Sequence, residues 1–213
     1  MKDADESREL RRQQRHWGRH AESYDSKVAK AERSMLAGTR EWVGERAAGR
    51  VLEVAIGSGR SLPFYRRDVS LVGVDLSPEM LAIARRRAAE LGRPVDLREG
   101  NAEALPFDDA SFDTVVCALA LCSIPRPAVA VAEMARVVAP GGSVVVVDHV
   151  RSDRAVLFAG QWMLERFTIP LQGEHLTRRH RGEVEAAGLA VVEDERLHSG
   201  SVERIRAVRE ATT

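Results

Sequence analysis

Cysteine is scarce in this sequence of 213 residues, which contains only Cys117 and Cys122, both within an apolar segment. Two such thiols offer neither a disulfide framework nor the ligand spacing of a metal site. We therefore expect a protein of the reducing cytoplasm that holds no metal. Because cysteines in apolar strands usually serve as small hydrophobic residues, both are interpreted mainly as core.

Long apolar runs are also lacking, and the first eight residues, Met-Lys-Asp-Ala-Asp-Glu-Ser-Arg, contain no apolar run. We therefore expect neither a secretory signal nor an integral membrane segment, and predict a soluble protein. A charge excess is absent as well, because 32 basic side chains balance 32 acidic ones. This balance gives no global electrostatic reason to expect nucleic acid as a partner.

Short apolar runs alternate with helical patterns from residue 50 onward. Strands are predicted at 51–56, 70–75, 95–99, 112–121 and 143–147, with helices at 78–91 and 129–138. Ser77 is expected to cap the first helix, with Pro78 at its first position. The alternation is typical of an α/β, Rossmann-like fold in which helices cover both faces of a parallel sheet.

Three regions depart from this alternation. Residues 1–48 are polar and helical, and we predict that they form an N-terminal lid of two helices on a core at 49–213. Residues 151–180 are a mostly helical insertion, predicted to contribute to a substrate pocket, and a further helix is expected at 180–187. Strands at 189–196 and 201–208 flank the turn His198-Ser199-Gly200, which predicts an antiparallel hairpin at the sheet edge.

The strongest local sign of a binding site is Glu53-Val54-Ala55-Ile56-Gly57-Ser58-Gly59. A strand that ends in glycines lets backbone amides approach a ligand at the start of the next helix. Asp75 closes the following strand, where a carboxylate can accept both hydroxyl hydrogens of a ribose. A tight turn at the glycines and a helix cap at Asp75 are the structural alternatives. Since Ser77 can provide the cap, ribose binding is favoured.

Glycine spacing helps to separate two adenosine-containing cofactors. A nicotinamide site needs the pattern G-x-G-x-x-G, whereas Gly57 and Gly59 are followed here by Arg-Ser-Leu. A ligand without phosphate groups needs less of that cradle. Asn101, at the end of the third strand, is placed to face the exocyclic amine of an adenine, with Met80 against one face of the ring.

Five stretches together resemble the class I S-adenosylmethionine-dependent methyltransferases. They are Val51-Leu52-Glu53-Val54-Ala55-Ile56-Gly57-Ser58-Gly59, Gly73-Val74-Asp75-Leu76-Ser77-Pro78-Glu79-Met80, Asn101-Ala102-Glu103-Ala104-Leu105-Pro106-Phe107, Ser111-Phe112-Asp113-Thr114-Val115-Val116 and Arg136-Val137-Val138-Ala139-Pro140-Gly141-Gly142. The resemblance implies S-adenosyl-L-methionine as cofactor and a seven-stranded sheet whose last strand is antiparallel. It also implies a set of cofactor-binding residues: Tyr24, Glu53, Ala55, Gly57, Gly59, Asp75, Leu76, Met80, Asn101, Ala102, Ala118 and Leu119.

Two positions depart from the family pattern. Ala55 stands where a glycine is usual, and its methyl group is tolerated there if φ is negative. Asn101 stands where an aspartate is usual, and it still accepts a hydrogen bond through its carbonyl oxygen. Both departures concern how tightly the cofactor is held.

A narrower similarity covers residues 117–124, Asp148-His149-Val150 and Gly173-Glu174-His175-Leu176-Thr177-Arg178. These stretches resemble small-molecule thiol methyltransferases and relatives of phospholipid N-methyltransferases. The segment around Tyr24 is similar to the lid of methyltransferases of ubiquinone and menaquinone biosynthesis. The resemblance therefore implies a subgroup but leaves the acceptor open.

Two histidines are candidate catalytic bases for an acceptor that must lose a proton. His149 follows the fifth strand, at the edge where open α/β sheets bind ligands, and His175 lies in the insertion. A packing role is the alternative for both. The apolar residues of the insertion are the expected wall of the acceptor pocket, namely Leu157, Phe158, Trp162, Met163, Leu164 and Phe167.

We expect methyl transfer to a small-molecule acceptor at a heteroatom, with a thiol sulfur favoured. N-methylation of a phospholipid headgroup amine and C-methylation of a quinone-type ring remain alternatives within the same class. A non-catalytic scaffold that only binds the cofactor is the alternative of another class.

Overall fold

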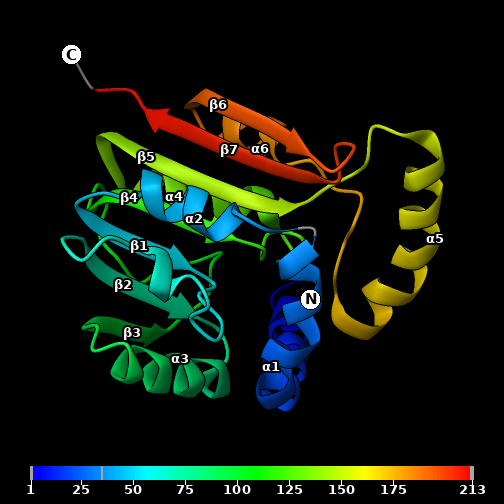
Figure 1. The fold of residues 1–213 in the computed structure, drawn as a ribbon, viewed down its shortest axis with the longest axis horizontal. Helices are drawn as coiled ribbons and strands as arrows, with labels where there is room; N and C mark the ends of the chain where they lie inside the picture. Colours follow the sequence, from blue (N-terminus) through cyan, green and yellow to red (C-terminus); the bar gives the residue numbers. More distant parts are fainter. Residues whose placement is uncertain (1, 35, 212–213) are drawn as a thin grey trace.

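The computed structural model describes residues 2–34 and 36–211, and its strands form one sheet in the order β3-β2-β1-β4-β5-β7-β6 (Figure 1). Strands β1 to β5 pair in parallel, whereas β7 runs antiparallel to both β5 and β6. The predicted Rossmann-like fold with a hairpin at the sheet edge is confirmed. The strands are β1 (Arg50–Val54), β2 (Ser70–Asp75), β3 (Val95–Glu99), β4 (Phe112–Ala118), β5 (Val138–His149), β6 (Leu189–Leu197) and β7 (Val202–Arg209).

Helices cover both faces of the sheet because consecutive strand residues point to opposite sides. Val115 and Val146 pack on one face with α4 and α6, whereas Val116 and Val145 pack on the other with α2, η1 and α3. All four valines are fully buried or nearly so. The helices named here are α2 (Thr39–Arg46), the 3-10 helix η1 (Leu62–Phe64), α3 (Pro78–Glu90), α4 (Pro127–Val137) and α6 (Arg181–Ala186).

Helix α3 begins as the sequence predicts. The Ser77 hydroxyl accepts a hydrogen bond from the backbone N–H of Met80 at 3.2 Å, and Pro78 occupies the first turn. Leu81, Ala84 and Ala88 are buried one or two turns apart on a single face. This cap fixes the start of α3 directly after the carboxyl end of β2, which positions the loop between them.

Two element boundaries differ from the prediction. Strand β4 ends at Ala118 rather than at 121, because Leu119 adopts a φ of 60° and turns the chain out of the sheet. Strand β5 begins at Val138, directly after α4, rather than at 143. Its pairing with β4 shifts register near Phe112, and Gly141 has a φ of 79°. A bulge therefore absorbs the Pro-Gly-Gly segment that was expected to be a loop.

Helix α1 (Lys2–Ser34) lies across the edge of the sheet where β1 and β2 end (Figure 1). It is one long helix, and α2, the second helix predicted within 1–48, packs instead in the core through Trp42 and Val43. Of the two helices, α1 lies at the carboxyl ends of the parallel strands, whereas α2 packs on one face of the sheet (Figure 1).

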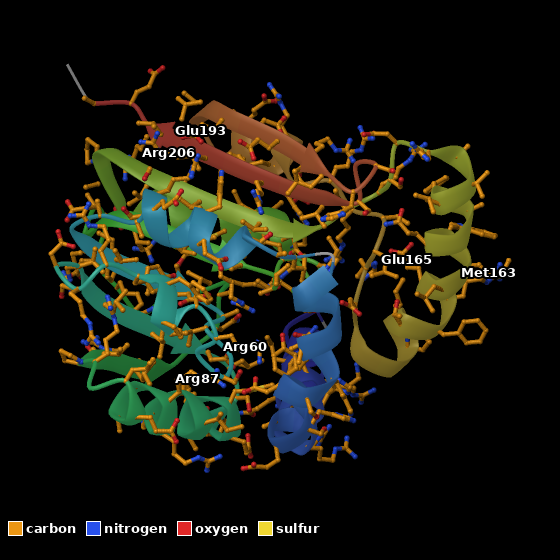
Figure 2. All side chains as sticks on the ribbon, viewed as in Figure 1. Arg60, Arg87, Met163, Glu165, Glu193 and Arg206 are labelled. Carbon is orange, nitrogen blue, oxygen red and sulfur yellow. The ribbon has the colours of Figure 1, made fainter. Side chains whose placement is uncertain are left out.

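Helix α5 (Ala155–Gln172) stands at the side of the molecule, away from the sheet (Figure 1). Gln161 ties it to the end of β5 by accepting from Ser152 N–H and donating to the Val150 carbonyl, and Glu165 accepts from the Thr177 hydroxyl at 2.6 Å. Figure 2 shows Glu165 on the inner side of α5 and Met163 on the outer side. Across residues 2–34 and 36–211, none of the helices combines the length and apolarity needed to cross a bilayer.

Candidate active site

The loop after β1 and the loop after β2 are joined by one carboxylate. Asp75 accepts a hydrogen bond from Gly57 N–H through one oxygen and from Ser77 N–H through the other, both at 2.8 Å. Burial raises the pKa of Asp75 from 3.8 to about 6, although these backbone hydrogen bonds act in the opposite direction. The aspartate thus fixes the glycine turn and carries a carboxylate at the edge where the strands end.

The glycines of this turn have different reasons for being glycine. Gly57 has a φ of 57°, and a Cβ placed on it would meet nothing within 4 Å, so its backbone borders open space. Gly59 has a φ of 74°, and its Cβ would lie 2.8 Å from Leu62 and 3.2 Å from Ala84. Gly57 therefore leaves room for a ligand, whereas Gly59 permits close packing of the turn against α3.

Ala55 adopts a φ of 52°, in the left-handed region. The condition under which its methyl group is tolerated without strain, a negative φ, is therefore not met. For a residue with a Cβ this conformation costs roughly 1–2 kcal/mol. Such strain is typically retained where the surrounding structure holds a functional loop in place.

Asn101 anchors the loop that follows β3. Its side-chain oxygen accepts a hydrogen bond from Glu103 N–H at 3.0 Å, and its backbone pairs with Ala104 in an isolated bridge. Met80, which is 3% exposed, comes from α3 to the same place. The loop therefore places the polar Asn101 next to the apolar side chain of Met80.

These loops enclose a first cavity of about 720 Å³, including its opening, beneath α1. Nine of the predicted cofactor-binding residues line it: Tyr24, Ala55, Gly57, Asp75, Leu76, Met80, Asn101, Ala102 and Leu119. The residues that were not predicted are Leu10, Gln13, Trp17, Gly100, Ala120, Ser123, Ile124 and Pro125.

The other three predicted residues lie outside the lining of this cavity. Glu53 is 2% exposed within β1, where burial raises the pKa of its carboxyl group while a hydrogen bond from Ser61 opposes the rise. Gly59 lies in the turn against α3, and Ala118 is the last residue of β4, packed against the core. Each of the three is within two residues of a residue that does line the cavity, namely Ala55, Gly57 or Leu119.

A second cavity of about 880 Å³, again including its opening, adjoins the first. Trp17, Tyr24, Leu119 and Ser123 line both, so the two spaces share a wall. The rings of Trp17 and Tyr24 pack edge to face, with 5.9 Å between their centroids. The remaining lining residues are His16, His20, Lys27, Val28, Leu36, His149 and Glu174.

Helix α1 is fastened to the glycine turn by ionic contacts. The Ser58 hydroxyl donates to Asp25 at 2.7 Å, Arg60 lies 3.4 Å from the same carboxylate, and Arg87 of α3 is hydrogen bonded to it. Arg60 and Arg87 lie where α1 approaches α3 (Figure 2). Together the two arginines and Ser58 hold the pKa of Asp25 below its ordinary value against the effect of burial.

The two predicted bases are placed differently. His149 ends β5 and lines the second cavity; its backbone N–H donates to Asp148 at 2.7 Å. His175 is absent from the lining of both cavities, and its Nδ1 lies 3.6 Å from Glu165 of α5. Burial and Arg178 lower the pKa of His175. Only His149 therefore faces the space beside the first cavity.

Sequence reasoning missed two polar groups beside His149. Asp148 is fully buried and accepts from Cys122 N–H at 2.7 Å, and Glu174 reaches the second cavity from the segment after α5. Of the predicted apolar wall on α5, Leu157, Trp162, Met163, Leu164 and Phe167 are exposed and Phe158 is half-buried; none of the six lines either cavity. The sequence did contain a signal for Asp148, because a carboxylate directly before His149 at the end of an apolar strand is well placed to accept hydrogen bonds from the loops there.

The seven-stranded sheet with its antiparallel β7 is the class I methyltransferase fold, and open α/β sheets bind ligands at the carboxyl ends of their strands. Solved structures agree: a SAM-dependent methyltransferase from Thermotoga maritima matches with a TM-score of 0.74 and 21% identity, covering 93% of this chain and 100% of that one. An O-methyltransferase family protein from Burkholderia thailandensis matches with a TM-score of 0.73 and 21% identity, over 92% and 61% of the two chains. At such identities the likeness concerns the fold alone.

Sequence relatives add the activity. The family model described as methyltransferase domain matches residues 52–146. Phosphatidylethanolamine N-methyltransferase of Cereibacter sphaeroides is 44% identical over 146 residues, covering 68% of this chain and 71% of that protein. Demethylmenaquinone methyltransferase of Thermus thermophilus is 41% identical over 107 residues, so the match spans about half of either chain. The chain belongs to the S-adenosylmethionine-dependent methyltransferases: it is an enzyme whose cofactor is S-adenosylmethionine.

Proposed function

We propose that the enzyme methylates a heteroatom of a small, largely apolar acceptor, with a thiol sulfur as the favoured atom. The observation that carries this proposal is the wall shared by the two cavities. A cofactor in the first cavity and an acceptor in the second would meet at Trp17, Tyr24, Leu119 and Ser123. The bound cofactor supplies a methyl group that its sulfonium already activates.

For the cofactor we propose one role for each part of the first cavity. Asp75 would accept the ribose hydroxyl hydrogens, and the turn from Ala55 to Gly59 would border the methionine moiety. Met80, Asn101 and Ala102 would hold the adenine, with Leu76 beside the ribose. The open side of Gly57 and the carboxylate between the two loops support this placement.

The enzyme's main task at the methyl group is positioning. The nucleophile must be held about 3–3.5 Å from the methyl carbon and water must be kept out. Trp17, Tyr24 and Leu119 supply apolar surface for this at the shared wall. Because a thiolate and a sulfonium lose their opposite charges in the transition state, an apolar site favours a sulfur nucleophile.

His149 is the predicted base that faces the acceptor cavity, so we assign it, rather than His175, to the acceptor's reacting group. Its ring can take up the acceptor's proton, or it can hold a cation that lowers the acceptor's pKa. A thiol has an ordinary pKa of about 8.5, so even modest assistance yields thiolate at neutral pH.

An ethanolamine headgroup is the second candidate acceptor, favoured by the 44% identity to the phosphatidylethanolamine N-methyltransferase. A headgroup amine would need only to lose its proton before attack. The exposed apolar side chains of α5 would then offer a surface that could contact the lipid that carries the headgroup.

A transfer assay with methyl-labelled cofactor tests the acceptor directly. Alkyl and aryl thiols, vesicles containing phosphatidylethanolamine, and a demethylated quinone are offered separately, with the Asp75→Ala variant as the control for enzyme-dependent label. We expect label on thiols. Label on vesicles alone would overturn the thiol assignment in favour of the headgroup amine, and label on the quinone alone would overturn both.

A further inference from the structure

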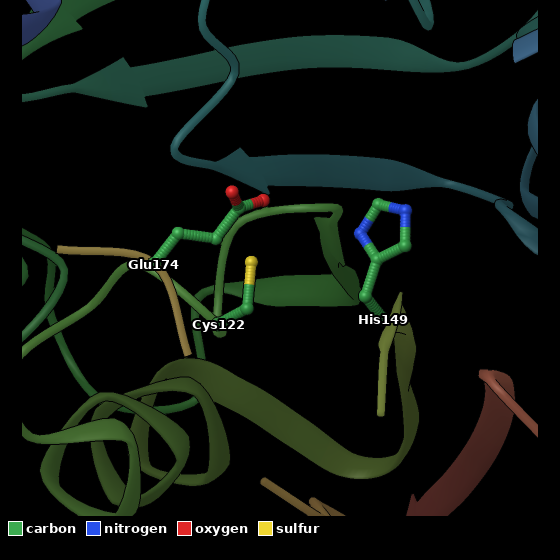
Figure 3. A group of neighbouring side chains, drawn as sticks. All are labelled: Cys122, His149 and Glu174. Atoms are coloured by element: carbon green, nitrogen blue, oxygen red, sulfur yellow. The ribbon is translucent and has the colours of Figure 1, made fainter. Parts of the chain in front are cut away.

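Three side chains from distant parts of the sequence meet beside the second cavity (Figure 3). Cys122 lies in the loop after β4, His149 ends β5, and Glu174 follows α5. One candidate ligand atom from each residue lies within 4.8 Å of the other two. Cys122 is 1% exposed, whereas His149 and Glu174 are half-buried and line the cavity.

The His149 ring offers an unused nitrogen to this cluster. Among the residues that the structure describes, buried Nδ1 has no hydrogen-bond partner, and its distance of 3.8 Å from Asp148 Oδ1 is too long for one. Figure 3 shows this nitrogen, the one bonded to the ring carbon that carries the side chain, on the ring side that faces Cys122 and Glu174. A buried, unpaired ring nitrogen is costly unless something binds it.

A single buried carboxylate holds two of the three residues in place. Asp148 accepts from Cys122 N–H through one oxygen and from His149 N–H through the other, both at 2.7 Å. Two basic side chains lie close by: Arg178 donates to the carbonyls of Leu121 and Ile124, and His180 Nε2 lies 3.9 Å from Asp148. Supporting contacts of this kind orient ligands in metal sites.

We propose that Cys122 Sγ, His149 Nδ1 and a carboxylate oxygen of Glu174 form a Zn²⁺ site. A thiolate and an imidazole select zinc over calcium or magnesium, which prefer oxygen ligands. Zinc bonds of about 2.0–2.3 Å place tetrahedral ligand atoms roughly 3.5 Å apart, so side-chain adjustments of about 1 Å close the site. Three protein ligands leave a fourth position open, as in catalytic zinc sites, and His149 and Glu174 direct it to the acceptor cavity.

This site rests on the proposed thiol acceptor for its role in the reaction. The acceptor R–SH binds at the open position as thiolate and releases its proton to solvent. The sulfur lone pair then forms the S–CH₃ bond while the bond from the methyl carbon to the sulfonium breaks, and that electron pair stays on the cofactor sulfur. The products are R–S–CH₃ and S-adenosylhomocysteine. Zinc thereby offsets the negative charge of Asp148 and Glu174, which would otherwise oppose a thiolate here.

Metal binding is measured on the full chain without any acceptor. Protein stripped with a chelator is titrated with Zn²⁺ alone by calorimetry and with Co²⁺ alone by absorption spectroscopy. We expect one ion per chain and a thiolate-to-cobalt absorption band. Cys122→Ser should remove the band and weaken Zn²⁺ binding at least about tenfold. Cys117→Ser is the matched control, an equally buried cysteine outside the cluster, and should change neither.

A second variant keeps the test decisive if Cys122→Ser folds poorly. Glu174→Gln changes a half-buried side chain, and S-adenosylhomocysteine affinity reports whether the fold is intact. Weaker zinc binding with unchanged S-adenosylhomocysteine affinity supports the site. Absence of stoichiometric zinc binding to the wild-type chain, or an equal loss in Cys117→Ser, overturns it.

The two proposals fail separately. If zinc binds as described but no thiol accepts label, the thiol acceptor falls and the metal site stands. If metal-free and zinc-loaded protein methylate thiols at the same rate, the catalytic role of the ion is overturned while the thiol acceptor stands.

Discussion

The two cavities of this methyltransferase are built in contrasting ways. The first is formed by loops at the ends of β1, β2, β3 and β4, and a buried carboxylate ties two of these loops together. The second is formed mainly by α1, by the loop after β4, and by His149 at the end of β5 and Glu174 after α5, a helix with six exposed apolar side chains. The proposed cofactor cavity is thus built mainly on strand-end loops, whereas the proposed acceptor cavity relies more on α1 and on the segment after α5.

The largest effect that we expect comes from the proposed cofactor cavity. Asp75→Ala removes a charge-assisted hydrogen-bond acceptor worth roughly 1.5–3 kcal/mol, so cofactor affinity should fall about 10- to 150-fold. Isothermal titration with S-adenosylhomocysteine measures it. Asp68→Ala, an exposed carboxylate before the start of the same strand, serves as the control. Equal affinities for the two variants would break the ribose assignment.

Cofactor affinity should also depend on pH through the same carboxylate. Ribose hydroxyls need the ionised form, and the pKa of Asp75 in the free protein is about 6. Affinity should be nearly level above about pH 7 and fall by about tenfold between pH 7 and pH 5. Asp75→Asn should show a flat profile over this range. An unchanged wild-type affinity at pH 5 would contradict the proposed contact.

Stability of the free protein should change in the opposite sense. The folded-state pKa of Asp75 is raised above its ordinary value of 3.8, so the native state binds more protons than the unfolded state between the two values. The contribution of Asp75 to the free energy of unfolding should therefore decrease as the pH rises from about 4 to about 6. Comparing urea unfolding of the wild type and Asp75→Asn across this range measures the pH-dependent contribution of Asp75 to the free energy of unfolding.

A smaller effect is expected where the turn is strained. Ala55→Gly relieves a positive φ at roughly 1–2 kcal/mol and loses about 0.5–1 kcal/mol to the extra freedom of glycine when unfolded. The net result should be a gain of about 0.5–1 kcal/mol in the free energy of unfolding. Ala118→Gly, at the end of β4 and without a positive φ, should be destabilising instead. Chemical denaturation measures both, and destabilisation by Ala55→Gly would contradict the strain.

The smallest effect should be on α5. Trp162→Ala and Phe167→Ala change side chains that are 52% and 62% exposed, so each should alter the free energy of unfolding by less than about 0.5 kcal/mol. Phe112→Ala, in the buried core, should cost about 3–5 kcal/mol. A large loss from either α5 variant would show that this helix packs more firmly than the structure indicates.

The same contrast explains what could be predicted from the sequence. The parallel sheet and its edge hairpin were predicted from short contiguous patterns, and the resemblance to the methyltransferases implied nine residues that line the first cavity. Cys122, His149 and Glu174 come from three segments that are far apart in the sequence, so no local spacing marks them. The apolar residues of α5 were predicted to line a pocket, but they line neither cavity. Apolarity alone does not tell which surface a helix side chain faces. The start of β5 was missed because a bulge takes in the Pro-Gly-Gly segment.

Trp17 and Tyr24 belong to both walls, and Asp25 fastens their helix to the glycine turn. With the cofactor and the acceptor placed as proposed, the spent cofactor and the methylated product would both leave past this one helix. We then expect the turnover rate to depend on how often the contacts of Asp25 with Ser58, Arg60 and Arg87 break. Added salt screens the two ion pairs, so it should speed the release of both molecules and weaken their binding.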